Sequence, residues 1–240
     1  MDHAHALAAR PARADYGLDA PGVVRALAIA AILCLVVAAV FRPARGFVFA
    51  GVLMAAEAAL MTWSSRRGKL RERERLLDLV PWRGDERVLD IGCGRGLLLL
   101  GAARRLRSGR AVGVDLWQSR DQSGNALEAT LANADAEGVR DRVDVRTGDA
   151  RHLEFPDASF DVVLSSLAIH NIPSAEGRER AVREAARVLR PGGRLLLLDF
   201  RHSAAYARML RSCGLACVRR SRLHFGMFPP VRVVSARKAC

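Results

Sequence analysis

An acidic residue followed by three glycines at alternate positions, in the segment Asp90–Gly96 (DIGCGRG), constrains the fold of this chain more than any other feature. The apolar residues Val88 and Leu89 precede the segment, and the apolar run Leu97–Leu100 follows it at once. This order predicts a short buried strand, a tight turn and a helix, because glycine adopts the backbone conformations that a sharp turn needs. Such a turn lies at the carboxyl end of a strand, where open α/β sheets bind their ligands.

The spacing of the glycines argues against two common nucleotide-binding patterns. The dinucleotide pattern G-x-G-x-x-G would need a glycine at position 97, which is Leu97. The phosphate-binding pattern G-x-x-x-x-G-K-[ST] is also absent from the sequence. The pattern present is D-x-G-x-G-x-G.

From residue 85 onward, short apolar runs alternate with helical segments that carry arginine and glutamate. This alternation predicts βα units around a parallel sheet. We expect an α/β, doubly wound, mostly parallel seven-stranded sheet, with helices near 70–80, 96–107, 123–137, 175–190 and 203–213. The expected strands are 87–91, 111–115, 143–147, 160–165, 194–199, 215–220 and 231–236.

Several segments, in this order, resemble the motifs of class I S-adenosylmethionine-dependent methyltransferases. They are the glycine segment Asp90–Gly96, Ala111–Asp115, Thr147–Ala150, Phe160–Ser166 and Arg187–Arg194. The resemblance covers roughly residues 72–238. Within the family, this part of the chain is similar to the methyltransferases of quinone biosynthesis. The resemblance implies a Rossmann-like methyltransferase fold, S-adenosyl-L-methionine as cofactor and methyltransferase activity.

The resemblance also implies a cofactor site. In the family, an acid in the place of Asp115 binds the ribose hydroxyls, and one in the place of Asp149 holds the adenine amino group. Trp117 either flanks the adenine or packs in the core. The alternative roles of Asp90, Asp115 and Asp149 are a backbone cap, a helix cap and a turn residue. The implied cofactor-binding residues are Asp90, Gly92, Gly94, Gly96, Asp115, Leu116, Trp117, Asp149, Ala150 and Ser165.

His170 and Asn171 follow the fourth expected strand and are the candidate catalytic residues. An imidazole with an ordinary pKa near 6.5 suits proton removal at neutral pH. The alternative is that His170 hydrogen-bonds the backbone and only shapes the pocket. Asn171 is expected to hold the cofactor or the acceptor. No cluster with metal-ligand spacing appears, so no metal is expected.

The apolar run Val23–Phe41 has the length of a membrane-spanning helix, and a second apolar stretch, Phe47–Trp63, contains Glu57. Two membrane helices, one span with an interfacial helix, and a buried hairpin in a soluble oligomer are the open alternatives. The arginine cluster from residue 66 to 75 favours a cytoplasmic end there. The expected domains are a flexible tail (1–21), a membrane-associated helical hairpin (22–64), a basic linker and helix (65–84) and a methyltransferase domain (85–240).

The formal net charge is +13, and almost all of the positive charge is carried by arginine. A basic chain can bind nucleic acid, but no nucleic-acid-binding module accompanies this charge. The sequence therefore predicts a membrane-anchored enzyme with a cytoplasmic catalytic domain that methylates a small or lipid-like acceptor. The alternative is a non-catalytic membrane scaffold that keeps the fold and the cofactor. The acceptor atom and the oligomeric state stay open.

Overall fold

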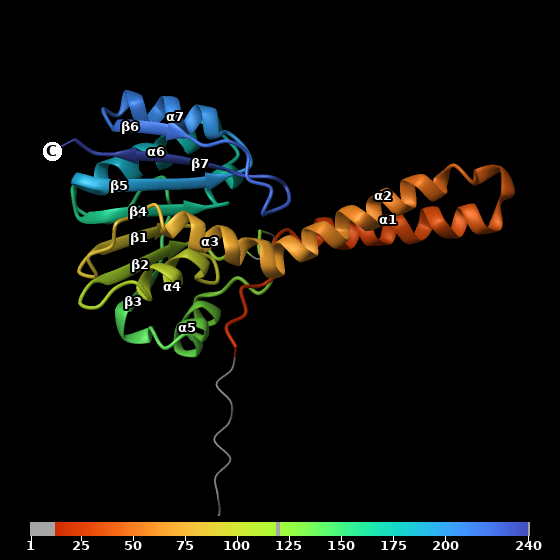
Figure 1. Ribbon diagram of the computed structural model, residues 1–240, viewed down its shortest axis with the longest axis horizontal. Helices are drawn as coiled ribbons and strands as arrows, with labels where there is room; N and C mark the ends of the chain where they lie inside the picture. The colour runs from red at the N-terminus through yellow and green to blue at the C-terminus, as the bar shows by residue number, and fades with distance from the viewer. Residues whose placement is uncertain (1–12, 119–120, 240) are drawn as a thin grey trace, which may run out of the picture.

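The computed structural model describes residues 13–118 and 121–239. Its main body is built on a seven-stranded sheet in the order β3-β2-β1-β4-β5-β7-β6 (Figure 1). Strand β7 is antiparallel to β5 and β6, and the pairs among β1 to β5 are parallel. The strands are β1 (Arg87–Ile91), β2 (Arg110–Asp115), β3 (Val143–Thr147), β4 (Phe160–Ser166), β5 (Leu189–Asp199), β6 (Ala216–Arg220) and β7 (Arg232–Arg237).

Helices cover both faces of this sheet, because successive strand residues point to opposite sides. Val88 belongs to the core cluster shared with α3, α4 and α5, whereas Leu89 belongs to the cluster shared with α6 and α7. The expected doubly wound α/β fold with a mostly parallel sheet is thus confirmed. The helices are α3 (Lys69–Leu77), α4 (Leu97–Ala103), α5 (Leu127–Ala136), α6 (Ala175–Val188) and α7 (Ser203–Ser212).

The fifth strand is longer than the sequence predicts. It begins at Leu189 rather than Arg194 and continues through Pro191-Gly192-Gly193. Its pairing with β4 shifts register between Phe160 and Val162, which accommodates the irregular start. Pro191, Gly192 and Gly193, residue types that are common in turns, therefore lie in an irregular part of a strand.

A helical hairpin projects from the sheet domain (Figure 1). It consists of α1 (Pro21–Val40), a 3-10 turn (Arg42–Ala44) and α2 (Phe47–Trp63), and a π-helical turn (Ser64–Gly68) joins α2 to α3. The two helices approach closely at Gly51, where an added Cβ would lie 2.9 Å from Leu35 Cγ. Many of the apolar side chains of the hairpin are exposed, including Ile29, Ile32, Leu33, Val36, Phe49, Val52 and Leu53.

Two helices of this structure are long and apolar enough to cross a membrane, judged by length and composition: Pro21–Val40 and the continuous helix Phe47–Leu77. Core helices of soluble proteins and signal sequences can meet the same criterion. In this chain, however, only 11% and 17% of the two apolar windows are buried. Such low burial is unlike that of a core helix, which hides its apolar face in the protein.

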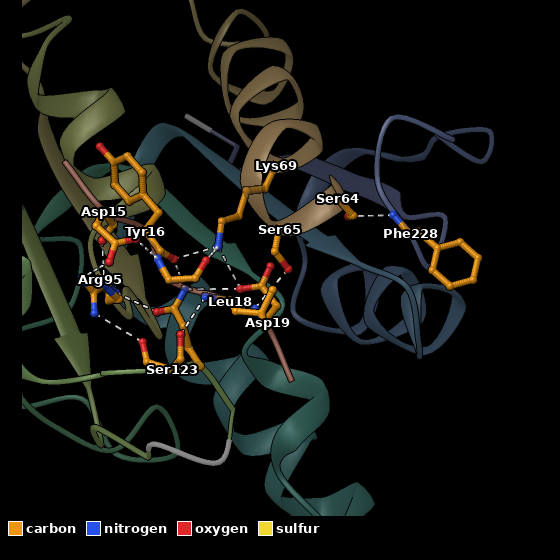
Figure 2. A network of polar contacts seen from close by, with 12 residues as sticks. Asp15, Tyr16, Leu18, Asp19, Ser64, Ser65, Lys69, Arg95, Ser123 and Phe228 are labelled. Carbon is orange, nitrogen blue, oxygen red and sulfur yellow. Dashed lines mark hydrogen bonds and ion pairs between the residues drawn. The ribbon is translucent and has the colours of Figure 1, made fainter. Parts of the chain in front are cut away.

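Residues 13–20, which the sequence analysis assigned to a flexible tail, lie along the sheet domain; we call them the strap. The buried Lys69 ammonium donates to the carbonyl oxygens of Tyr16 and Gly17 at 2.7 and 2.9 Å and to Asp19 Oδ1 at 3.0 Å (Figure 2). Arg95 binds the carboxylate of Asp15 at 2.9 Å. The tail prediction is thus wrong for these residues, and residues 1–12 lie outside the described part.

The strap was missed because its contacts are long-range. The strap is short and polar and contains a glycine, so its sequence does not distinguish an ordered segment from a flexible tail. Its backbone groups find partners 46 and 118 positions away in the chain: Ser65 Oγ for Asp19 N–H and Asn133 Oδ1 for Asp15 N–H. Only the tertiary structure brings these partners together.

Candidate active site

A cavity of about 520 Å³ lies at the carboxyl ends of β1, β2 and β4. A cavity of this volume is within the usual range for small-molecule and cofactor sites. Parallel strands place their carboxyl ends at one edge, so motifs far apart in sequence converge there. Nine of the twelve predicted site residues line it: Asp90, Gly92, Gly94, Asp115, Leu116, Asp149, Ala150, His170 and Asn171.

Two glycines let the loop after β1 pass very close to its neighbours. A Cβ on Gly92 would lie 2.1 Å from Ala168 Cβ, and one on Gly94 would lie 2.6 Å from Gln122 Oε1. Both have a positive φ, at 71° and 51°, which residues with a side chain rarely adopt. Glycine at these positions therefore lets the loop pack tightly against Ala168 and Gln122 while both residues line the cavity.

Asp90, at the end of β1, carries a carboxylate oxygen without a protein partner in the described residues. Oδ2 accepts a hydrogen bond from the Leu99 amide at 2.9 Å, whereas the buried Oδ1 has none. Burial, with a smaller contribution from the nearby Asp115 charge, raises the pKa of Asp90 to about 7. A buried carboxylate of this kind favours a cationic ligand group, which would lower its desolvation cost.

Asp115, at the end of β2, fixes the glycine loop as well as facing the cavity. Its Oδ2 accepts from Gly94 N at 2.8 Å, and its Oδ1 accepts from Trp117 N at 2.7 Å and from Asn125 Nδ2 at 3.2 Å. A carboxylate has about four acceptor positions, so capacity remains for a ligand hydroxyl. From the sequence, Asp115 was expected to bind a ligand or to cap a helix, and the structure adds the loop contact.

Asp149 lines the cavity from the loop after β3, but its carboxylate is already paired. Arg151 Nε lies 2.9 Å from both oxygens, and the Arg151 amide donates to Oδ1 at 2.8 Å. These hydrogen bonds lower the pKa of Asp149. The pair is partly exposed, so the arginine can turn outward when a ligand donor approaches the carboxylate.

Three predicted cofactor residues lie outside the lining of the cavity. Gly96 has a φ of 88° and precedes α4, where it ends the turn. The indole of Trp117 donates to Thr147 Oγ1 at 2.8 Å and packs on the core, in agreement with the packing alternative. Ser165 is buried and donates to Ile91 O at 2.8 Å, which links β4 to β1, whereas the next residue, Ser166, lines the cavity.

His170 lies in a 3-10 turn (Ile169–Asn171) after β4 and faces Asp199 at the end of β5. Its Nδ1 is 3.0 Å from Asp199 Oδ1, which is close enough for an ion pair. The angles between the two groups are not those of a hydrogen bond. The Phe200 ring packs edge-on against the imidazole, with centroids 4.6 Å apart. The buried Asp199 also accepts from Tyr206 OH at 3.2 Å and from Arg201 N at 3.0 Å.

Burial and the adjacent Asp199 carboxylate raise the pKa of Tyr206, so its hydroxyl stays protonated and donates to Asp199. The arrangement orients one carboxylate oxygen toward His170 Nδ1. When Nδ1 carries the proton, Nε2 keeps the lone pair that a general base needs. The sequence analysis missed Asp199, although an acid at the carboxyl end of a buried strand is the same signal that identified Asp90 and Asp115.

Asn171 lines the cavity beside His170, but its Nδ2 is only weakly bound, 3.4 Å from Leu167 O. The loop that bears both residues is placed by β5, since the Leu167 amide donates to Leu198 O at 2.9 Å. The segment 224–230 also reaches the site, and its Met227, Phe228 and Pro229 line the cavity. The described residues contain no cluster of metal-ligating side chains.

Comparison with known proteins identifies the central part of this domain. Residues 89–197 match the family described as "Methyltransferase domain". These residues are a methyltransferase domain. They contain β1 to β5, the glycine loop and His170, and they extend almost to Asp199.

Curated relatives and a solved structure agree with this assignment. The chain is 38% identical to 27-O-demethylrifamycin SV methyltransferase of Amycolatopsis mediterranei, over 58% of this chain and 49% of that protein. It is 35% identical to the ubiquinone/menaquinone biosynthesis C-methyltransferase UbiE of Roseobacter denitrificans, over 53% and 48%. A SAM-dependent methyltransferase from Aquifex aeolicus shares the fold, with 17% identity and a TM-score of 0.55 over 70% of this chain and 90% of that one.

The chain spans about half the length of the curated relatives it matches. The domain is of the S-adenosylmethionine-dependent methyltransferase class, and S-adenosylmethionine is its cofactor. The cavity fits this group in two respects. The backbone of Gly92 and Gly94 lines the cavity without side chains that would fill it, and the unpaired Asp90 oxygen suits a molecule with ammonium and sulfonium charges.

Proposed function

We propose that the whole protein transfers the methyl group of S-adenosylmethionine to a small or lipid-like acceptor at a membrane. The observation that carries this proposal is that His170, which lines the same cavity as the glycine loop, is paired with the buried Asp199. A binding protein needs the loop but has no need of an oriented base. This pair therefore favours the enzyme over a non-catalytic scaffold that retains the cofactor.

In this proposal the residues of the chain have separate roles. Asp90, Asp115 and the bare backbone of the glycine loop hold the cofactor, which supplies a methyl group on a sulfonium when bound. Asn171 orients the cofactor or the acceptor, and His170 Nε2 removes the acceptor proton, with Asp199 holding the imidazole in place. The names of relatives include O-methyltransferases and quinone C-methyltransferases, whose acceptors are consistent with this proton removal.

The hairpin is proposed to anchor the enzyme in a bilayer. The 20 residues of α1 reach about 30 Å, the thickness of the hydrocarbon core. Because α1 and α2 form a hairpin, both ends lie beside the sheet domain, which supports two spans rather than one. The exposed Arg66, Arg67 and Arg71 lie at that end, as expected for a cytoplasmic domain. Arg45 at the far turn runs against this trend.

The cofactor role is tested by Asp115→Ala. We expect S-adenosylmethionine to bind about 10-fold to 150-fold more weakly, because hydrogen bonds to a charged acceptor contribute about 1.5–3 kcal/mol. Isothermal calorimetry measures the change, with Asp144→Ala as a control on the strand end remote from the cavity. Unchanged affinity in Asp115→Ala, or tight NAD binding without S-adenosylmethionine binding, would contradict the assignment.

The raised pKa of Asp90 predicts that cofactor affinity depends on pH. Since the carboxyl of Asp90 loses its proton near pH 7, a cationic ligand should bind more tightly as the pH rises from 5.5 to 7.5. The increase is at most about tenfold per pH unit and levels off above the pKa. Asp90→Asn should remove this rise. Calorimetry at several pH values measures it, and an equally steep rise in Asp90→Asn would show that another group is responsible.

A further inference from the structure

The cavity that holds the glycine loop and His170 extends into the base of the hairpin. Val23 of α1 and Glu57 and Met61 of α2 line it together with the residues of the cofactor site. Ser65 and Lys69, farther along the same continuous helix, also line it. The cofactor site and the hairpin therefore share one space.

The four helix residues follow one another at intervals of four: Glu57, Met61, Ser65 and Lys69. Residues four apart lie on one face of a helix, so one stripe faces the cavity. The strap occupies the domain end of this stripe, where Asp19 N–H donates to Ser65 Oγ at 3.1 Å and Lys69 binds the strap carbonyls (Figure 2). At the other end, no described residue of the strap makes a hydrogen bond with the side chain of Glu57 or Met61.

Polar contacts also hold this face of the helix against the active-site loops. Ser64 Oγ accepts from Phe228 N at 2.8 Å, and Phe228 lines the cavity (Figure 2). Nδ1 of the buried His224 lies 3.1 Å from Oε2 of Glu72 on α3. The position of Glu57 relative to the cofactor site is thus set by contacts on both sides of the helix. From Ser65, Glu57 lies eight residues, or about 12 Å, farther into the hairpin.

Glu57 is the one acidic residue between positions 21 and 63. Its side chain is half-buried, and within residues 13–118 and 121–239 it makes no hydrogen bond or ion pair. A carboxylate on an otherwise apolar helix is costly and usually marks a ligand or transport path. With no partner in the described protein, its remaining use is to accept a hydrogen bond from a ligand in the cavity.

We propose that the acceptor is a membrane-soluble amphiphile whose hydroxyl or amine group donates a hydrogen bond to Glu57. This rests on the proposed function and names its acceptor class. An ionised carboxylate only accepts hydrogen bonds, so the group that it recognises is a donor. The apolar part of the acceptor lies against Val23, Met61 and Phe228, and it enters from the bilayer along the hairpin. Glu57 is a specificity-determining residue and takes no part in bond formation.

Matched twelve-carbon probes test this proposal on the full chain in phosphatidylcholine nanodiscs saturated with S-adenosylhomocysteine. Tritiated 1-dodecanol, dodecylamine and dodecanoate share one chain and differ in the head group. Specific binding is the amount of probe that protein-loaded nanodiscs retain in excess of empty nanodiscs. We expect the alcohol and the amine to bind at least about tenfold more tightly than the carboxylate. Glu57→Leu should abolish this discrimination, and Glu57→Gln should lower the preference for the amine most.

Leu60→Gln is the matched control, because Leu60 is exposed on α2 and lies outside the lining of the cavity. It should retain the discrimination. Affinity for S-adenosylmethionine, measured on each variant, verifies the fold and separates the two proposals. If the cofactor binds but Glu57→Leu discriminates as the wild type does, or dodecanoate binds as well as the other probes, the acceptor proposal is wrong. If the wild type binds no S-adenosylmethionine, the proposed function is wrong.

Discussion

Replacing His170 by alanine is expected to lower kcat by about 10²–10⁴, with the affinity for S-adenosylmethionine nearly unchanged. The physical reason is that the proposed function gives His170 the acceptor proton, whereas it gives the glycine loop and Asp115, which line the same cavity, the cofactor. Methyl transfer from labelled S-adenosylmethionine measures the rate, and calorimetry measures the affinity. Near-normal turnover by His170→Ala would remove His170 from the catalytic residues and leave alignment by the fold as the mechanism.

Asp199 provides the companion test, because it acts through His170 as a positioning residue. Asp199→Asn keeps the shape of the side chain but weakens the preference for a proton on Nδ1 of His170. We expect a lower kcat and a displaced acid-side limb in the pH profile of kcat/KM. If His170 only shapes the pocket, His170→Gln and Asp199→Asn should both keep much of the rate and an unaltered pH profile.

The second large effect concerns the hairpin. Full-length protein is expected to pellet with membranes and to stay there in 1 M salt, because an apolar span is not held by charges that salt screens. Replacing residues 22–63 by a short glycine-serine linker should release a folded domain that still binds S-adenosylmethionine. A short linker suffices because Asp19 N–H and Ser65 Oγ are 3.1 Å apart. A full-length protein that stays soluble without detergent would instead indicate a hairpin buried in an oligomer.

The contrasting variant removes residues 1–64 and with them the strap. It leaves Lys69 and Asn133 without the strap groups that they bind. A buried polar group without a partner costs about 1–3 kcal/mol, so we expect a clearly lower Tm than in the linker variant. Equal thermal stability of the two variants would show that the strap contributes nothing to the fold.

Much of the site was predictable because it depends on local patterns. A buried strand that ends in an acid and a glycine turn is encoded within about nine residues, as at Asp90–Gly96. Since parallel strands end at one edge of the sheet, Asp115, Asp149 and His170 were expected to converge there, and they line one cavity. Ser165 lies outside the lining whereas Ser166 lines the cavity, because neighbours in a strand point to opposite sides. For Trp117 the sequence left adenine contact and core packing open, and only the structure shows it packed on the core.

The strand and helix order, the glycine loop and the two apolar helices could be predicted from the sequence, because periodicity and turn residues act over a few positions. The meeting of distant groups could not, because it depends on how the elements pack. The tertiary structure placed Asp199 3.0 Å from His170, bound the strap to Lys69, and brought Glu57 into the cofactor cavity. The His170–Asp199 and Tyr16–Lys69 contacts join residues 29 and 53 positions apart, and packing of whole elements, rather than any local preference, sets such distances.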